Sequence, residues 1–250
     1  MFSIGIGPSS SHTVGPMKAA KLFIDELQKQ SRLLKTDRVK CELFGSLGQT
    51  GIGHGTGKAV ILGLSGEMPE TIPVDSIEAI LADVVASHKI RLDGKHSVDF
   101  PKDDAIIYHH RKTLPAHANA MTLFAYQGDA IILEQTYYSI GGGFIVEDCD
   151  FEKEKDKALS LHSNINRPHK FSTAAELLAL AQESGLSIST MMMNNEKCLN
   201  DEVSIRTKLV DIWQAMCASV ERGMSTEGIL PGGLKVNRRA PALHRSLKVE

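Results

Sequence analysis

The chain has 250 residues, enough for one large domain or two ordinary ones, and it should bury roughly 70–75% of the surface of its unfolded form. Hydrophobic residues make up 42% of the sequence and charged residues 23%, as in ordinary globular proteins, and 28 basic against 30 acidic residues leave a net charge of −2. This balance predicts no nucleic-acid partner, and the lack of an apolar run of ~18 residues or of a secretory signal predicts no membrane partner, so we expect a cytoplasmic enzyme or binding protein.

The first half of the chain mixes helical and strand patterns. Apolar residues recur every three or four positions from Met17 to Leu27 and predict a helix over 16–30, with Pro16 in its first turn. A strand is predicted over 39–44, and helices over 58–64 and 76–89. Eight of the 21 glycines lie between Gly45 and Gly66, which indicates tight loops or a close approach of the backbone to something.

From residue 97 the hydrophobic period changes to two. Strands are predicted over 105–109, 121–126 and 130–138, the last two joined by a tight turn at Gly128-Asp129. We therefore expect an α+β domain over residues 1–148, built from a mixed sheet with helices.

A charged stretch predicts a polar connector over 149–170. Thr173 and Glu176 form a capping-box pattern that opens a helix, and further helices are predicted over 188–197 and 202–222, the last ended by Gly223. Residues 171–250 thus resemble the start of an incomplete all-α domain.

The four cysteines, Cys41, Cys149, Cys198 and Cys217, are 108, 49 and 19 residues apart. A self-contained zinc or iron–sulfur site usually takes at least two ligands from neighbouring positions. The spacing favours four reduced thiols and no metal site within this chain.

A polar cluster comes directly before the first predicted helix: Ser9, Ser10, Ser11, His12 and Thr13. The free N–H groups and partial positive charge of a helix N-terminus bind phosphate or carboxylate, and they favour a neutral histidine that can act as a base. The alternative is an N-cap loop whose serines only satisfy backbone donors.

A second histidine, His54, lies between Gly53 and Gly55, two residues before Thr56 and again just ahead of a helix. The glycines leave room for a ligand, although a flexible surface loop is the alternative. The segment is not a phosphate-binding Walker motif, because Ala59 follows Lys58 where serine or threonine is required.

A third candidate follows the last predicted strand, where Ser139 precedes Gly141, Gly142 and Gly143. A strand that ends in three glycines can present backbone donors to an anion, and a sheet edge with a bulge is the alternative. Weaker candidates are expected to have packing or surface roles: His109, His110, His117 and the methionines 191–193. The loop 227–233, followed by Arg238 and Arg239, is a candidate anion-contacting loop, and a solvated turn is the alternative.

Five segments together resemble the iron–sulfur-dependent bacterial L-serine dehydratases, or L-serine ammonia-lyases. They are Gly-Pro-Ser-Ser-Ser-His-Thr-Val-Gly-Pro at 7–16, Gly-Ser-Leu at 45–47, Gly-His-Gly-Thr at 53–56, Tyr-Tyr-Ser-Ile-Gly-Gly-Gly-Phe at 137–144 and Thr-Glu-Gly-Ile-Leu-Pro-Gly at 226–232. The resemblance covers nearly the whole chain, in the right order, but only about the first half of a family member.

The resemblance implies an N-terminal β domain followed by a helical catalytic domain whose cysteines hold a [4Fe–4S] cluster. Those cysteines should lie beyond Glu250, so none of the four thiols here is carried over as a ligand. The implied reaction converts L-serine to pyruvate and ammonia in a cytoplasmic homodimer. This chain would need the missing cysteine-bearing half as its partner and would be inactive and without cofactor alone.

In this interpretation His54 is the base that removes the α-proton, because its glycine neighbours leave the ring accessible, and His12 orients the substrate. The expected substrate-binding residues are Ser9, Ser10, Ser11, Thr13, Thr56, Ser139, Gly141 and Gly142. Gly57 stands where the family commonly has aspartate, which bears on how His54 is oriented. Two alternatives remain: a regulatory serine-binding or dimerisation domain without catalytic residues, and a phosphate-binding enzyme unrelated to serine.

Overall fold

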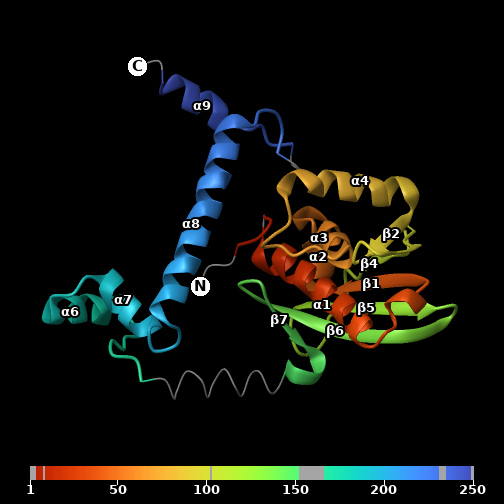
Figure 1. Ribbon diagram of the computed structural model, residues 1–250, viewed down its shortest axis with the longest axis horizontal. Coiled ribbons are helices and arrows are strands. Elements are labelled where there is room, and N and C mark those ends of the chain that lie inside the picture. Colours follow the sequence, from red (N-terminus) through yellow and green to blue (C-terminus); the bar gives the residue numbers. More distant parts are fainter. Residues whose placement is uncertain (1–3, 8, 102, 152–165, 231–234, 249–250) are drawn as a thin grey trace. The chain divides into compact units, whose positions relative to one another are not determined.

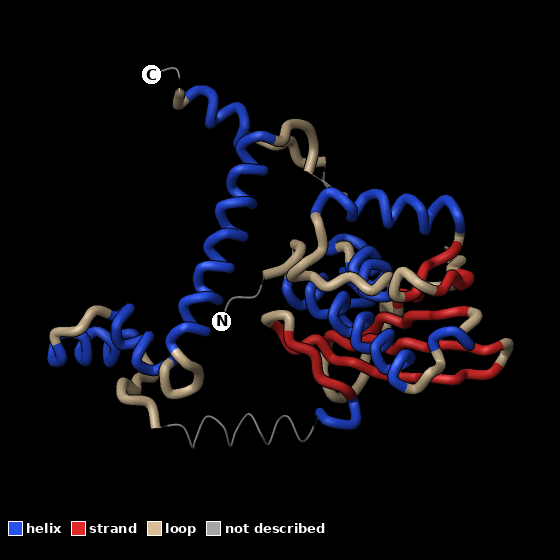
Figure 2. Tube along the Cα trace, viewed as in Figure 1, coloured by secondary structure: helices blue, strands red, loops and turns tan. Residues whose placement is uncertain are grey.

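The structure is a computed structural model that describes residues 4–7, 9–101, 103–151, 166–230 and 235–248. The chain divides into two compact units, residues 1–152 with 228–237 and residues 153–227 with 238–250, and each is described by itself. Figure 1 labels the elements of both units, and Figure 2 separates helices from strands by colour. None of the described helices combines the length and the apolar character that a membrane crossing requires.

The first unit is built on a seven-stranded mixed sheet of order β2-β3-β1-β5-β6-β7, with β4 also paired to β1. Strand β1 is parallel to β3 and β4 and antiparallel to β5, and the hairpins β5–β6 and β6–β7 follow one another. The strands are β1 Arg38–Phe44, β2 Lys89–Leu92, β3 His96–Asp99, β4 Ile106–Tyr108, β5 Asn119–Gln127, β6 Ala130–Gly141 and β7 Phe144–Glu147. This confirms the predicted α+β class.

Four α-helices accompany this sheet in the first unit (Figure 1): α1 Gly15–Lys29, α2 Gly45–His54, α3 Thr56–Leu64 and α4 Ile77–Ser87. A π-helical turn, η1 at Ser10–Val14, runs directly into α1. The apolar stripe of α1, including Phe23, Ile24 and Leu27, is fully buried in one core with alternate residues of β1 and β5. The predicted first helix is therefore confirmed, together with its core face.

The strands predicted over 39–44, 105–109, 121–126 and 130–138 are confirmed as β1, β4, β5 and β6, and Gly128-Asp129 forms the turn between the last two. The patterning missed β2, β3 and β7. These strands have four residues each, too few for a period of two to be distinguished from chance.

The glycine-rich segment is helical, so the expectation of tight loops there is wrong and the alternative of a close backbone approach is confirmed. Helices α2 and α3 meet at Gly55, whose φ of +71° is left-handed. A Cβ on Gly48 would overlap the carbonyl groups of His109 and Leu43. Tertiary packing of α2 against the strands thus outweighs the low helix propensity of glycine.

The second unit is helical in its described part, with α6 Ala174–Ser184, α7 Ile188–Glu196, α8 Glu202–Ser225 and α9 Ala240–Ser246. The capping box is confirmed, because Thr173 and Glu176 each accept from the other's backbone N–H. Helix α8 continues through Gly223, so the predicted end was wrong by three residues. Most of the predicted connector, residues 152–165, lies outside the described residues.

Candidate functional site

The two predicted catalytic histidines lie against each other. His12 belongs to η1, and His54 is the last residue of α2. Their ring centroids are 4.7 Å apart and the ring planes are inclined by 56°. The fold therefore brings together two motifs that are far apart in the sequence.

The His12 segment is a helical turn rather than an open loop. Ser9 is its N-cap and accepts a 3.3 Å hydrogen bond from the His12 N–H, so the N-cap alternative holds for this serine. Pro16 has no N–H and cannot donate to the carbonyl of His12, four residues earlier. The Thr56 hydroxyl donates to that carbonyl instead, at 2.7 Å.

Both nitrogens of the His12 imidazole are engaged. Nδ1 is 2.9 Å from the Ser11 Oγ, and Nε2 is 2.9 Å from the Ser46 Oγ. Burial first, and the neighbouring His54 second, hold the pKa of His12 below its ordinary value. The lower pKa favours the neutral imidazole, which can donate one hydrogen bond and accept the other from these two hydroxyls.

His54 is more open than His12. Its side chain is half-buried, and no described residue makes a hydrogen bond to its imidazole. Its backbone carbonyl accepts a 3.2 Å hydrogen bond from the Thr13 hydroxyl. The ring of His54 thus remains available to a ligand while its backbone is fixed.

Ser46 is the site residue that the sequence reasoning did not select, although Gly45-Ser46-Leu47 was one of the recognised segments. It lies in the first turn of α2. Gly45 before it has φ +56°, and a Cβ there would overlap the Ala118 carbonyl. The Gly-Ser-Leu motif was the only sequence feature that pointed to Ser46. Its contact with His12 depends on the packing of α2 beside η1.

The predicted substrate-binding residues fall into two groups. Ser9, Ser11, Thr13 and Thr56 surround the histidine pair, and Ser10 is exposed on the same turn. The other group belongs to the end of β6, as follows.

Ser139 is buried at the end of β6, and its Oγ has no hydrogen-bond partner among the described residues. It packs so closely on Gly15, the first residue of α1, that a Cβ on Gly15 would overlap the Ser139 Oγ. Gly141 and Gly142, with φ of +98° and +61°, form the turn to the edge strand β7, next to a register shift after Ser139. This is the geometry of the sheet-edge bulge considered for these residues.

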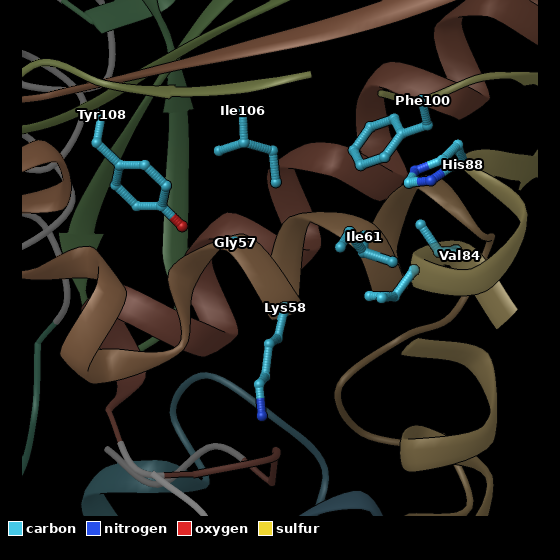
Figure 3. Close-up of a pocket in the computed structure, with 9 residues that line it drawn as sticks. Gly57, Lys58, Ile61, Val84, His88, Phe100, Ile106 and Tyr108 are labelled. Atoms are coloured by element: carbon cyan, nitrogen blue, oxygen red, sulfur yellow. The ribbon is translucent and has the colours of Figure 1, made fainter. Parts of the chain in front are cut away.

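Gly57 backs onto Tyr108, as Figure 3 shows for a pocket between α3, α4 and β4. The Tyr108 hydroxyl occupies the place that a Cβ on Gly57 would take. Burial raises the pKa of Tyr108, so the phenol stays neutral. The space that a side chain at position 57 would take is therefore occupied by the Tyr108 hydroxyl.

His109 has a carboxylate partner that its sequence neighbours did not reveal. Its Nε2 is 2.8 Å from Glu42 of β1, and its ring stacks on Phe44 with centroids 4.7 Å apart. The Nδ1 of His117 accepts the backbone N–H of Asn119 at 3.0 Å. These contacts agree with the packing roles expected for both histidines.

The four thiols do not fit a [4Fe–4S] cluster. Cys41 is fully buried in the core on β1, where burial strongly raises the pKa of its thiol and disfavours the thiolate that iron requires. Cys149 lies beside Glu147 and Asp150, and without Cys41 only three thiols remain for a cluster that takes four. The described residues therefore offer no set of four thiolate ligands.

Comparison with known proteins finds relatives that match nearly the whole chain. The sequence model of the family "Serine dehydratase beta chain" matches residues 1–150. The chain is 49% identical to the L-serine dehydratase of Streptomyces coelicolor over 251 residues, which cover 100% of this chain and 54% of that protein. It is 46% identical to L-serine dehydratase 1 of Escherichia coli over 248 residues, 99% of this chain and 53% of that protein. The chain thus spans about half the length of the curated relatives it matches.

Proposed function

Because the chain belongs to the serine dehydratase beta chain family, we propose that it is the amino-terminal part of an L-serine ammonia-lyase, acting in the cytoplasm. The observation that carries this proposal is the contact between His12 and His54, with ring centroids 4.7 Å apart, inside the matched residues. Elimination from serine needs a base at the α-carbon and groups that hold the carboxylate, and the site offers both kinds of group.

We assign the α-proton to His54. A base must reach the substrate, and the His54 ring is half-buried and not hydrogen-bonded by any described residue. The His12 ring is buried and held at both nitrogens by Ser11 and Ser46, so it suits a fixed orienting role. Removal of the α-proton and loss of the β-hydroxyl as water give aminoacrylate, which tautomerises and hydrolyses to pyruvate and ammonia.

The substrate carboxylate is assigned to the turn that precedes α1. Ser9, Ser10 and Ser11 present hydroxyls there, and the start of a helix favours negative charge. Ser139, Gly141 and Gly142 remain proposed contacts from the end of β6. Because the four thiols of this chain do not fit a [4Fe–4S] cluster, we propose that the cluster belongs to the carboxy-terminal half of the full-length protein. That half would complete the enzyme, which we propose to be a homodimer.

The test is substitution in the full-length enzyme. His54→Ala should lower kcat by about 10²–10⁴-fold, the usual contribution of a general base. His12→Ala should act mainly through KM if its contacts are equally strong in the ground and transition states. His110→Ala, at an exposed histidine outside the site, is the control and should change neither constant.

Two outcomes would contradict this assignment. A normal kcat in His54→Ala together with loss of α-proton exchange in His12→Ala would reverse the two roles. If His54→Ala keeps kcat and changes only the dependence on serine concentration, the chain is a regulatory serine-binding domain instead.

A further inference from the structure

The two histidine segments are joined by a pair of crossed hydrogen bonds. The Thr13 hydroxyl, next to His12, donates to the His54 carbonyl at 3.2 Å. The Thr56 hydroxyl, two residues after His54, donates to the His12 carbonyl at 2.7 Å. Each motif therefore fixes the backbone of the other motif's histidine.

The local backbone deprives both carbonyls of an ordinary helical donor. The His12 carbonyl cannot accept the usual α-helical bond because Pro16, four residues later, lacks an N–H. The His54 carbonyl lies at the end of α2, where the last four carbonyls of a helix have no partner within it. The left-handed Gly55 then turns the chain, so that Thr56 begins α3 and faces η1. The two threonine hydroxyls thus donate to two carbonyls that lack an ordinary helical donor.

Burial separates these threonines from the serine hydroxyls of the turn before α1. Thr56 is 0% exposed and Thr13 is 3% exposed, whereas Ser10 is exposed and Ser9 and Ser11 are half-buried. A buried hydroxyl that donates to a buried carbonyl is fixed in one orientation, and the branched Cβ of threonine limits its rotation further.

We propose that Thr13 and Thr56 are positioning residues that hold the His12 and His54 imidazoles against each other, and that they are not substrate ligands. The rings sit on separate elements, η1 and α2, so loss of either bond allows one element to shift relative to the other. The consequence for the reaction rests on the proposed function, whereas the consequence for the ring geometry does not.

The first measurement is made on the 250-residue chain by NMR. With ring centroids 4.7 Å apart, the imidazole protons of His12 and His54 should give a cross-peak by the nuclear Overhauser effect. Thr56→Val should weaken or abolish this cross-peak, and Thr56→Ser, which keeps the hydroxyl, should retain it. Should Thr56→Val fail to fold, Thr13→Val removes the longer bond and serves for the same measurement.

Thr36→Val is the matched control. Thr36 is also 0% exposed, and its hydroxyl donates to the Arg32 carbonyl at 3.1 Å, away from both histidines. Thr36→Val loses the same kind of hydrogen bond from an equally buried hydroxyl. Because this bond does not involve either histidine segment, the variant should keep the cross-peak. A cross-peak that persists in Thr56→Val and Thr13→Val would overturn the proposal.

The second measurement uses the full-length enzyme. A displacement of ~1 Å at a reacting group can cost about 10²-fold in rate, so Thr56→Val should lower kcat/KM by that order. Thr56→Ser should restore most of kcat/KM. A lower kcat/KM in Thr56→Val with an unchanged cross-peak would show a substrate ligand and overturn the proposal. Wild-type enzyme without lyase activity would refute the proposed function alone, because the cross-peak does not depend on activity.

Discussion

At the scale of single residues, Gly57 and Tyr108 share one space. A Cβ on residue 57 would overlap the Tyr108 hydroxyl but would lie 3.6 Å from its Cζ and 3.4 Å from the Ile106 Cδ1, both ordinary contacts. Among these contacts, only the hydroxyl therefore excludes a Cβ at position 57. The position is next to Thr56, so its packing bears directly on the histidine pair.

We predict that Gly57→Ala destabilises the chain by about 1–3 kcal/mol, the usual cost of overpacking. Tyr108→Phe makes the missing room, so Gly57→Ala with Tyr108→Phe should recover most of the loss, with a coupling of about 0.5–3 kcal/mol. Urea denaturation of the two single variants and the double variant measures this coupling. Strictly additive effects would show that the hydroxyl is not what excludes the side chain.

At the scale of elements, two helical glycines have opposite surroundings. A Cβ on Gly53 in α2 would meet nothing within 4 Å. A Cβ on Gly63 in α3 would overlap the Met17 carbonyl and lie 2.7 Å from the Ala20 Cβ, both on α1. Helices α1 and α3 thus approach each other closely at Gly63, and backbone atoms cannot yield as a side chain can.

The same substitution should therefore have opposite signs at the two positions. Gly53→Ala should stabilise by about 0.5–1 kcal/mol through helix propensity, and Gly63→Ala should destabilise by about 1–3 kcal/mol through overpacking. The denaturation midpoints of the two variants, compared with wild type, provide the measurement. A stabilised Gly63→Ala would contradict the close approach of α1 and α3.

At the scale of the whole molecule, helix α8 carries several large apolar side chains that are exposed in the described part of the chain. They include Val203, Leu209, Val210, Trp213, Met216 and Val220. Leu209, Trp213, Met216 and Val220 recur every three or four residues and so share one face of α8. The relatives are about twice as long as this chain, and an exposed apolar face marks an interaction site. We expect this face to be covered in a protein of that length.

Trp213 is the single tryptophan of the chain and is 63% exposed. We predict that Trp213→Lys leaves the stability of the 250-residue chain unchanged but lowers that of the full-length protein by about 3 kcal/mol, as for a buried tryptophan. Thermal unfolding of both lengths checks this. Gln214→Lys, at the exposed neighbouring residue, is the control and should change neither. Equal effects of Trp213→Lys at both lengths would contradict a covered face.

Local patterning determined much of this protein. The apolar stripe of α1, the β5–β6 hairpin with its Gly128-Asp129 turn and the capping box at Thr173 follow from neighbours along the chain, because helix and strand periods and turn chemistry act over a few residues. The motifs also indicated His12 and His54 and the family resemblance.

Tertiary structure alone decided how these residues meet. Long-range packing placed His12 beside His54, brought Ser46 to the His12 Nε2 and supplied Thr56 to the His12 carbonyl, to which Pro16 cannot donate. It also made a helix of glycines that, by propensity, belong in loops, because the absence of a Cβ at Gly48 lets α2 lie directly on the strands. Such contacts depend on the free energy of the whole packed unit, which cannot be read from any short stretch of the sequence.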